Sequence, residues 1–174
     1  MEKNERGLIN LRSFNSLNIR SYCKKLFRLS SIDDLSVFHD QCYKHRLILG
    51  EGTNVVIDAP EHRPITYPVL LNKIKKRTIL YSQGNNVHVR SFGGENWNDF
   101  VLWTLANNIG GIENLISIPG TVGAAPFQNI GAYGVEIGKL ISAVEVWDFK
   151  KKTVKRLTGK ECKFSYRSSL FKEQ

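Results

Sequence analysis

Apolar and polar positions in the first part of the chain alternate between helical and strand-like spacing. Residues 31–45 predict an amphipathic helix, because apolar side chains recur every three or four positions behind Ser31, which can cap the first turn. The apolar runs at 46–49 and 55–58 lie on either side of the glycine-containing segment 50–54. This pattern predicts two strands joined by a tight loop.

Further along, residues 65–71 and 78–82 predict strands, and Asn85-Asn86 marks the turn of a hairpin that continues through residues 87–90. From Asn96 onward the apolar spacing changes to three and four. This change of period predicts a helix that begins after a cap at that residue.

That helix is expected to stop at Gly110 or Gly111, since glycine commonly follows the last helical turn. Residues 141–147 and 153–157 predict a second hairpin, with three lysines at 150–152 in its turn. Separate helices and hairpins in this order indicate an α+β fold.

Two glycine-containing loops are the candidate ligand sites. Residues 119–125 predict a turn that exposes backbone N–H groups able to hold an anion, although a tight turn between packed elements would have the same composition. Residues 50–54 could likewise direct N–H groups and the Thr53 hydroxyl at phosphate oxygens, or could form an ordinary hairpin turn. A β-branched run follows this loop, which disfavours the Rossmann fingerprint because that loop must lead into a helix, and the P-loop is disfavoured because it needs Gly-Lys-Ser/Thr.

Composition narrows the partners without choosing one. The chain has 174 residues, 41% of them hydrophobic, and a net charge of +9, with a pI near 9.6. This size fits one domain or two small ones, and the charge favours anionic partners. A nucleic-acid-binding protein is the alternative from another function class. The basic residues are scattered in small groups and do not form the patch typical of such proteins, so we expect no nucleic-acid partner.

Cysteine usage and hydropathy set further expectations. Three widely spaced cysteines do not suggest a disulfide framework, and the pair Cys42 and His45 has no second pair to complete a zinc site. The first residues contain no apolar segment typical of a secretion signal, and no apolar run approaches the length of a membrane span. We therefore expect no metal, no membrane association and a cytoplasmic location.

Several blocks of sequence together resemble one enzyme family. In order along the chain, the blocks are Gly50-Glu51-Gly52-Thr53-Asn54, Gly94-Glu95-Asn96-Trp97, residues 118–123 (IPGTVG), residues 128–134 (QNIGAYG) and residues 166–172 (YRSSLFK). With the entry segment 13–17 (SFNSL), their order and spacing are similar to those of the UDP-N-acetylenolpyruvoylglucosamine reductases, also called UDP-N-acetylmuramate dehydrogenases.

The resemblance implies a fold and an activity. The fold would be an FAD-binding domain of the vanillyl-alcohol-oxidase type, divided into two small α/β subdomains at residues 1–70 and 71–174. The activity would belong to bacterial peptidoglycan precursor synthesis, in which NADPH reduces FAD and the reduced flavin passes hydride to an enolpyruvyl UDP-sugar. The substrate domain of the family, with its proton-donating serine and catalytic glutamate, has no counterpart in these 174 residues, so a separate chain could supply it.

The resemblance also implies roles for individual residues. Arg167 matches the catalytic arginine, and Tyr133 and Tyr166 match substrate-contacting positions. The residues implied to bind FAD are Gly50, Glu51, Gly52, Thr53, Asn54, Gly120, Thr121, Val122, Gly123, Gln128, Asn129, Gly131, Ala132 and Gly134.

Three positions depart from the family pattern. Ser16 replaces the usual threonine, Asn18 stands where glycine is common, and Glu51 requires its carboxylate to point away from a bound diphosphate. An FAD-binding module or a decayed remnant without turnover is the alternative to an active enzyme.

Overall fold

A computed structural model describes residues 3–36 and 45–173. The chain divides into two compact units, Met1–Lys73 and Ile74–Gln174, and each has its own hydrophobic core. The sequence placed this boundary between residues 70 and 71. The structure keeps the whole of strand β5 (Val69–Asn72) in the first unit.

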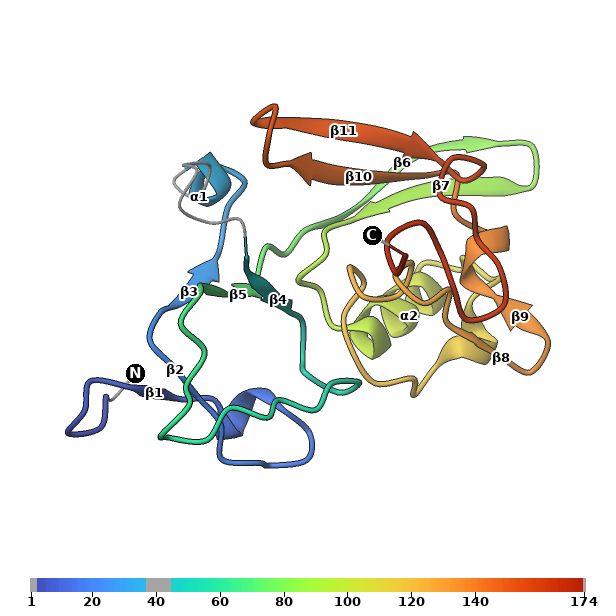
Figure 1. Ribbon diagram of the computed structural model, residues 1–174. Coiled ribbons are helices and arrows are strands. Elements are labelled where there is room, and N and C mark those ends of the chain that lie inside the picture. The colour runs from blue at the N-terminus through green and yellow to red at the C-terminus, as the bar shows by residue number, and fades with distance from the viewer. Residues whose placement is uncertain (1–2, 37–44, 174) are drawn as a thin grey trace. The chain divides into compact units, whose positions relative to one another are not determined.

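The first unit is built on a small parallel sheet with strand order β3-β5-β4 (Figure 1). Strand β5 lies between β3 (Leu26–Leu29) and β4 (Leu47–Leu49), and its residues Val69, Leu70 and Leu71 are all buried. An unbroken apolar run suits a strand that is covered on both faces. Strands β1 (Ile9–Asn10) and β2 (Tyr22–Cys23) form a separate antiparallel pair.

One predicted strand is absent from this unit. Residues 55–58 are in the described part of the chain but have no regular structure. The side chain of Val56 is 73% exposed, and the carbonyl of Ile57 accepts a hydrogen bond from the Ser21 hydroxyl instead of a strand neighbour. Similarly, the strand predicted at 65–71 begins only at Val69, because Pro68 has no N–H to donate to the sheet.

The predicted helix at 31–45 is described only at its start. Helix α1 (Asp33–Ser36) begins where expected, and the Ser31 hydroxyl accepts a hydrogen bond of 3.3 Å from the Asp34 backbone N–H. The carboxylate of Asp34 accepts in turn from the backbone N–H groups of Ser31 and Ser30, which lowers the pKa of that carboxyl. Residues 37–44 of the predicted helix lie outside the described residues.

The second unit carries both predicted hairpins (Figure 1). Strands β6 (Arg77–Gln83) and β7 (Asn86–Ser91) form the first, and their turn at Gly84-Asn85 comes one residue earlier than predicted. Strands β10 (Ala143–Asp148) and β11 (Thr153–Thr158) form the second. An ion pair of 2.9 Å between Arg90 and Glu145 joins one hairpin to the other.

Helix α2 (Trp97–Ala106) contributes the buried side chains of Trp97, Phe100 and Val101 to the second core. The side chain of Asn96 accepts a hydrogen bond of 2.9 Å from the Asp99 N–H, which confirms the predicted cap. The helix ends at Ala106 with Asn107 as its C-cap, earlier than the predicted stop at Gly110 or Gly111, and Asn108 adopts a left-handed conformation with φ 57°. Asparagine tolerates this conformation, so it can end a helix as glycine does.

Short elements connect α2 to the second hairpin and form the loops discussed below. They are η3 (Glu113–Leu115), β8 (Gly131–Ala132), β9 (Val135–Glu136) and η4 (Ile137–Lys139); a further short helix, η1 (Arg12–Phe14), lies in the first unit. Across the described residues, no helix has the length and apolar character needed to cross a membrane.

Candidate functional site

The first glycine loop directly follows strand β4. Gly52 is buried with φ 67°, and a Cβ there would overlap the carbonyl oxygen of Phe14. Its own carbonyl accepts a hydrogen bond of 3.1 Å from the Ser16 N–H. Only glycine fits this close approach of two backbone segments.

Two backbone donors of this loop have no acceptor within the described residues: the N–H groups of Gly50 and Gly52. Gly52 is buried and Gly50 is half-buried. An N–H group that is shielded from water without a partner is costly, so a bound group with acceptor oxygens would be favoured here. A pocket of about 220 Å³ lies at the same loop, lined by Ser16, Leu17, Thr53, Asn54, Val55 and Val56. Gly50 and Gly52 are not among the residues that line this pocket, which is formed in part by the residues that follow them.

The second glycine loop, residues 119–125, differs from the bare turn that the sequence predicted. The N–H groups of Val122 and Gly123 donate to Glu95 and Gly93 at 2.9 and 3.0 Å, and those of Ala124 and Ala125 donate to the carbonyl of Thr121. These four donors are therefore already used within the protein.

A smaller donor set remains at this loop. Among the described residues no acceptor is found for the N–H groups of Gly120 and Thr121, nor any partner for the Thr121 hydroxyl. Gly123 has a different role from the one its motif suggested, because a Cβ there would meet the Gly93 backbone at 2.9 Å. The glycine permits backbone packing, while Gly120 and Thr121 hold the donors that a ligand could use.

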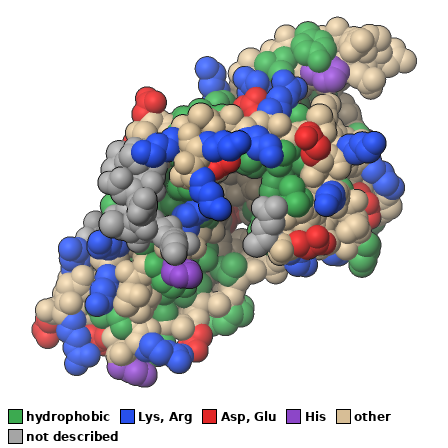
Figure 2. Space-filling model, turned by 45° about the horizontal axis from the view of Figure 1, so that its top comes forward, with side chains coloured by type: hydrophobic (Ala, Val, Ile, Leu, Met, Phe, Trp, Pro, Cys, Tyr) green, Lys and Arg blue, Asp and Glu red, His purple; other side chains and the backbone are tan. Residues whose placement is uncertain are grey.

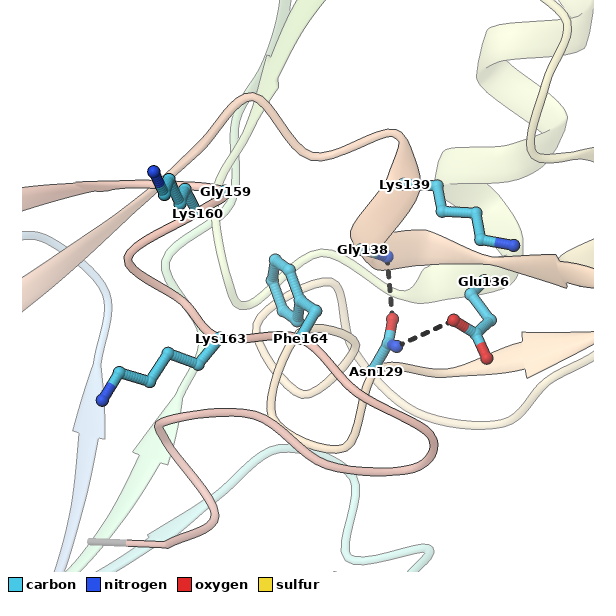
Figure 3. Close-up of a pocket in the computed structure, with 8 residues that line it drawn as sticks. All are labelled: Asn129, Glu136, Gly138, Lys139, Gly159, Lys160, Lys163 and Phe164. Atoms are coloured by element: carbon cyan, nitrogen blue, oxygen red, sulfur yellow. Dashed lines mark hydrogen bonds between the residues drawn. The ribbon is translucent and has the colours of Figure 1, made fainter.

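A third group of predicted residues lies in the loop 127–134 and the turn 165–168. Asn129 is 1% exposed, and its side-chain N–H₂ donates to the Ser165 carbonyl at 2.9 Å and to the Glu136 carboxylate at 3.3 Å. Its side-chain oxygen accepts from the Gly138 N–H at 2.8 Å. Figure 3 shows the bonds to Gly138 and Glu136.

The three residues with predicted chemistry are exposed beside this loop. Tyr133 and Tyr166 are 87% and 80% exposed, and the guanidinium of Arg167 lies 5.7 Å from the centre of the Tyr166 ring. The Nη1 atom of Arg167 is 3.5 Å from the position that a Cβ on Gly131 would occupy. The structure thus brings Arg167, Tyr166 and Gly131 together.

Three residues of the same group have a strained backbone conformation. Asn129, Tyr133 and Arg167 have φ of 47°, 48° and 52°. Residues other than glycine rarely adopt this left-handed region, and those that do often occur at functional sites.

A pocket of about 340 Å³ lies next to Asn129 (Figure 3). Its central side chains are Asn129, Glu136 and Phe164, while Lys139, Lys160 and Lys163 extend away from one another. The lysines do not converge on a point, so this pocket does not form an anion site of the kind expected at the glycine loops.

Three structurally important residues were missed or set aside at the sequence level. Ser169 is fully buried, and its hydroxyl donates to the Phe127 carbonyl at 2.6 Å. Gly93 receives the Gly123 N–H, and Gly138 has no room for a Cβ between Asn129 and Phe164. A closer inspection of glycines and serines inside the family blocks could have identified them, although their partners are distant in sequence.

The charged groups visible in Figure 2 are mixed, with Lys and Arg side chains interspersed among acidic and apolar ones. Cys23 and Cys162 are free and buried, and burial raises the pKa of the Cys23 thiol to about 11. Within residues 3–36 and 45–173, no group of three or more His, Cys, Asp or Glu residues could hold a metal ion.

Comparison with known proteins gives concordant results. A family model described as an FAD binding domain matches residues 24–158. The UDP-N-acetylenolpyruvoylglucosamine reductase of Flavobacterium johnsoniae is 35% identical over 165 residues, which are 94% of this chain and 48% of that protein. The Photobacterium profundum protein of the same name is 39% identical over 168 residues, with 94% and 47% covered.

A solved structure agrees with the fold. The crystal structure of UDP-N-acetylenolpyruvylglucosamine reductase from Thermus caldophilus superposes with a TM-score of 0.73 at 19% sequence identity, covering 93% of this chain and 55% of that one. The chain spans about half the length of the curated relatives it matches.

Proposed function

The chain belongs to the family of FAD binding domains, and from this membership we propose that it binds FAD as part of a UDP-N-acetylenolpyruvoylglucosamine reductase. The observation that carries the proposal is the family match over residues 24–158. At both glycine loops, backbone N–H groups that have no acceptor among the described residues are consistent with it.

The proposed FAD-binding residues are distributed over three segments. In the first unit, the Gly50 and Gly52 amides donate to the cofactor, with Glu51, Thr53 and Asn54 completing the loop. In the second unit, Gly120 and Thr121 are the donors, and Val122 and Gly123 hold the loop in shape through their bonds to Glu95 and Gly93. The third segment comprises Gln128, Gly131, Ala132 and Gly134. Asn129, which the resemblance also assigned to FAD, has its side-chain donors and acceptor bonded within the protein.

For the reaction we propose that NADPH is the reductant and an enolpyruvyl UDP-sugar the substrate. FAD, when bound, supplies the two-electron carrier between them. Arg167 is a fixed cation that can hold the substrate carboxylate and stabilise negative charge that develops on it. Tyr133 and Tyr166, both exposed, are the proposed substrate contacts, and the Tyr166 ring lies beside the Arg167 guanidinium.

A second candidate function is an FAD-binding module that does not complete the reaction alone. It is favoured because the chain spans about half the length of its relatives. A separate chain could then supply the remaining substrate contacts. Relatives in bacteria are consistent with a bacterial, cytoplasmic protein of peptidoglycan precursor synthesis.

A titration of FAD against the purified chain, followed by flavin fluorescence, tests the binding proposal. Thr121→Val removes one hydroxyl without changing side-chain shape. A hydrogen bond to a charged group is worth about 1.5–3 kcal/mol, so we expect the FAD dissociation constant to rise by about 10- to 100-fold. Thr104→Val is the matched control, because the Thr104 hydroxyl donates within α2, to the Val101 carbonyl at 2.8 Å, and has no other partner in the described part of the chain.

Absence of FAD binding by the unsubstituted chain would overturn the proposed function. Equal affinities in the Thr121 and Thr104 variants would remove the Thr121 hydroxyl from the site. The two candidate functions are separated by following NADPH oxidation without oxygen, with and without the enolpyruvyl UDP-sugar. Substrate-dependent oxidation by the chain alone indicates an enzyme, whereas FAD binding without it indicates the module.

A further inference from the structure

The turn that carries Arg167 is closed by its own backbone. Ser165 and Ser168 exchange two hydrogen bonds, both of 3.1 Å, and Arg167 lies between them with φ 52°. The Lys172 ammonium group donates to the Arg167 carbonyl at 3.1 Å. Because the backbone at Arg167 is strained, surrounding contacts must maintain its conformation.

Two side chains tie this turn to the loop 127–131. Asn129 donates to the Ser165 carbonyl at 2.9 Å on one side of Arg167, and Ser169 donates to the Phe127 carbonyl at 2.6 Å on the other. Both side chains are almost completely buried, with exposed fractions of 1% and 0%. Each bond crosses more than thirty positions of sequence, with separations of 36 and 42.

The side chain of Asn129 is fully occupied by these protein contacts. Its two N–H donors go to Ser165 and Glu136, and its oxygen receives the Gly138 N–H. Since the side chain is also buried, no donor is left to reach a ligand. The geometry thus separates Asn129 from neighbouring residues that could contact a cofactor directly.

The loop 127–131 also packs against the Arg167 guanidinium through Gly131. Arg167 Nη1 lies 3.5 Å from the place of a Cβ on Gly131, and a Cβ there would also meet the Val135 carbonyl oxygen at 2.8 Å. A shift of the turn 165–168 relative to this loop would therefore move the charged group.

We propose that Asn129 is a positioning residue that, together with Ser169, holds Arg167 over Gly131. Its side chain acts on the reaction through Arg167 and does not contact FAD. The effect on the reaction rests on the proposed function, but the positioning itself does not.

Nuclear magnetic resonance on the 174-residue chain tests this positioning. The Arg167 side-chain Nε–H signal is assigned by its loss in Arg167→Lys, and its cross-relaxation to the Gly131 Hα protons reports the contact. Asn129→Asp keeps the side-chain shape but places a carboxylate oxygen against the Ser165 carbonyl and the Glu136 carboxylate. We therefore expect the cross-peak between Arg167 Nε–H and Gly131 Hα to be lost. Asn107→Asp is the matched control, because Asn107 donates from an exposed position to the Trp103 carbonyl at 2.8 Å, and the cross-peak should remain.

Measuring the cross-peak at lower pH separates a positioning role of residue 129 from a general effect on stability. A protonated carboxyl at position 129 regains a donor, so the cross-peak of Asn129→Asp should return when the pH is lowered. Asn129→Ala has no such donor and should show no recovery. A cross-peak that persists in both variants at neutral pH would overturn the proposal, as would equal recovery in both.

Ser169→Ala covers the case in which the variants at position 129 do not fold. It removes the hydrogen bond to the Phe127 carbonyl, together with the hydroxyl oxygen that accepts from the Phe171 N–H at 3.2 Å, and leaves the Asn129 bonds in place. We expect a weakened cross-peak; an unchanged one would overturn the proposal. FAD affinity of folded Asn129 variants should stay within about twofold of the unsubstituted chain, while a tenfold loss would assign Asn129 to the cofactor instead. If the unsubstituted chain fails to bind FAD, the proposed function falls and the cross-peak comparison still decides the role of Asn129.

Discussion

At the scale of single residues, several residues other than glycine adopt backbone conformations that usually require glycine. Asn18, which departs from the glycine common in the family, has φ 56°. Its side-chain oxygen also accepts a hydrogen bond of 2.8 Å from Arg12 Nε. Asparagine is among the residues that adopt this conformation most readily. Asn18 thus adopts a conformation that glycine would also allow.

Gly52 provides a test of why its loop needs glycine. Gly52→Ala combines left-handed strain, about 1–2 kcal/mol, with overlap against the Phe14 carbonyl, and overpacking typically costs about 1–3 kcal/mol more. Gly7→Ala is the matched control in the same unit, because Gly7 has φ 72° but no atom within 4 Å of an added Cβ. We expect the Gly52 variant to lose clearly more unfolding free energy in urea. Equal losses would mean that the close approach to Phe14 has no energetic consequence.

For the candidate site residues, the sequence predicted the positions of the loops but not which of their N–H groups are free of internal hydrogen bonds. Glycine density and the family blocks located the loops around Gly52 and Gly120. They did not show which N–H groups remain available, because that depends on Gly93 and Glu95 pairing with Gly123 and Val122. Such pairing joins segments distant in sequence and leaves no local pattern.

At the scale of elements, locally encoded structure was predicted well. Helix α2, its Asn96 cap and both hairpins follow from spacing and turn residues within a short window. The parallel sheet was not predicted: β3 (Leu26–Leu29) has too few residues for a clear period, and its partner β5 is over forty positions away. The β-branched run at 55–58 predicted a strand, but no neighbouring strand pairs with it in the described structure.

The turn of the second hairpin should make its stability depend on pH. The Asp148 carboxylate accepts hydrogen bonds from the backbone N–H groups of Lys151 and Lys150, at 3.0 and 2.9 Å, and with nearby Lys151 and Lys155 charges these lower its pKa below the ordinary 3.8. A carboxyl with a lowered pKa in the folded state stabilises the fold above its unfolded pKa. This contribution is lost as the pH falls from 3.8 through the folded-state pKa.

Asp148→Asn therefore should destabilise the protein at neutral pH, and the difference from the unsubstituted chain should shrink below pH 3.8. Urea unfolding at a series of pH values measures it. Asp33→Asn changes the net charge equally at a side chain without a hydrogen-bond partner among the described residues, and it controls for charge alone. A destabilisation by Asp148→Asn that is the same at every pH would contradict the assignment.

At the scale of the whole molecule, net charge and local geometry make different contributions to anion binding. The chain carries a net charge of +9, yet its basic groups are interspersed with acidic and apolar ones on the face shown in Figure 2. A diffuse positive field attracts a dianion over a distance of about 10 Å at 0.1 M salt and is largely screened at higher salt. Backbone N–H donors such as those of Gly50 and Gly52 act only in contact and are screened much less.

If these donors provide most of the affinity for the FAD diphosphate, binding should weaken only modestly with salt. Exposed charge interactions contribute about 0.2–1 kcal/mol, and about 1.4 kcal/mol corresponds to tenfold in affinity. We therefore expect the FAD dissociation constant to rise by less than about tenfold between low and high sodium chloride concentrations, measured by flavin fluorescence. Riboflavin, which has the same ring and no phosphate, is the control and should show no such rise. A loss of FAD affinity well above tenfold would mean that lysine or arginine side chains, rather than the glycine-loop amides, hold the diphosphate. A matching rise in the riboflavin dissociation constant would show that salt acts on the contacts with the flavin ring instead.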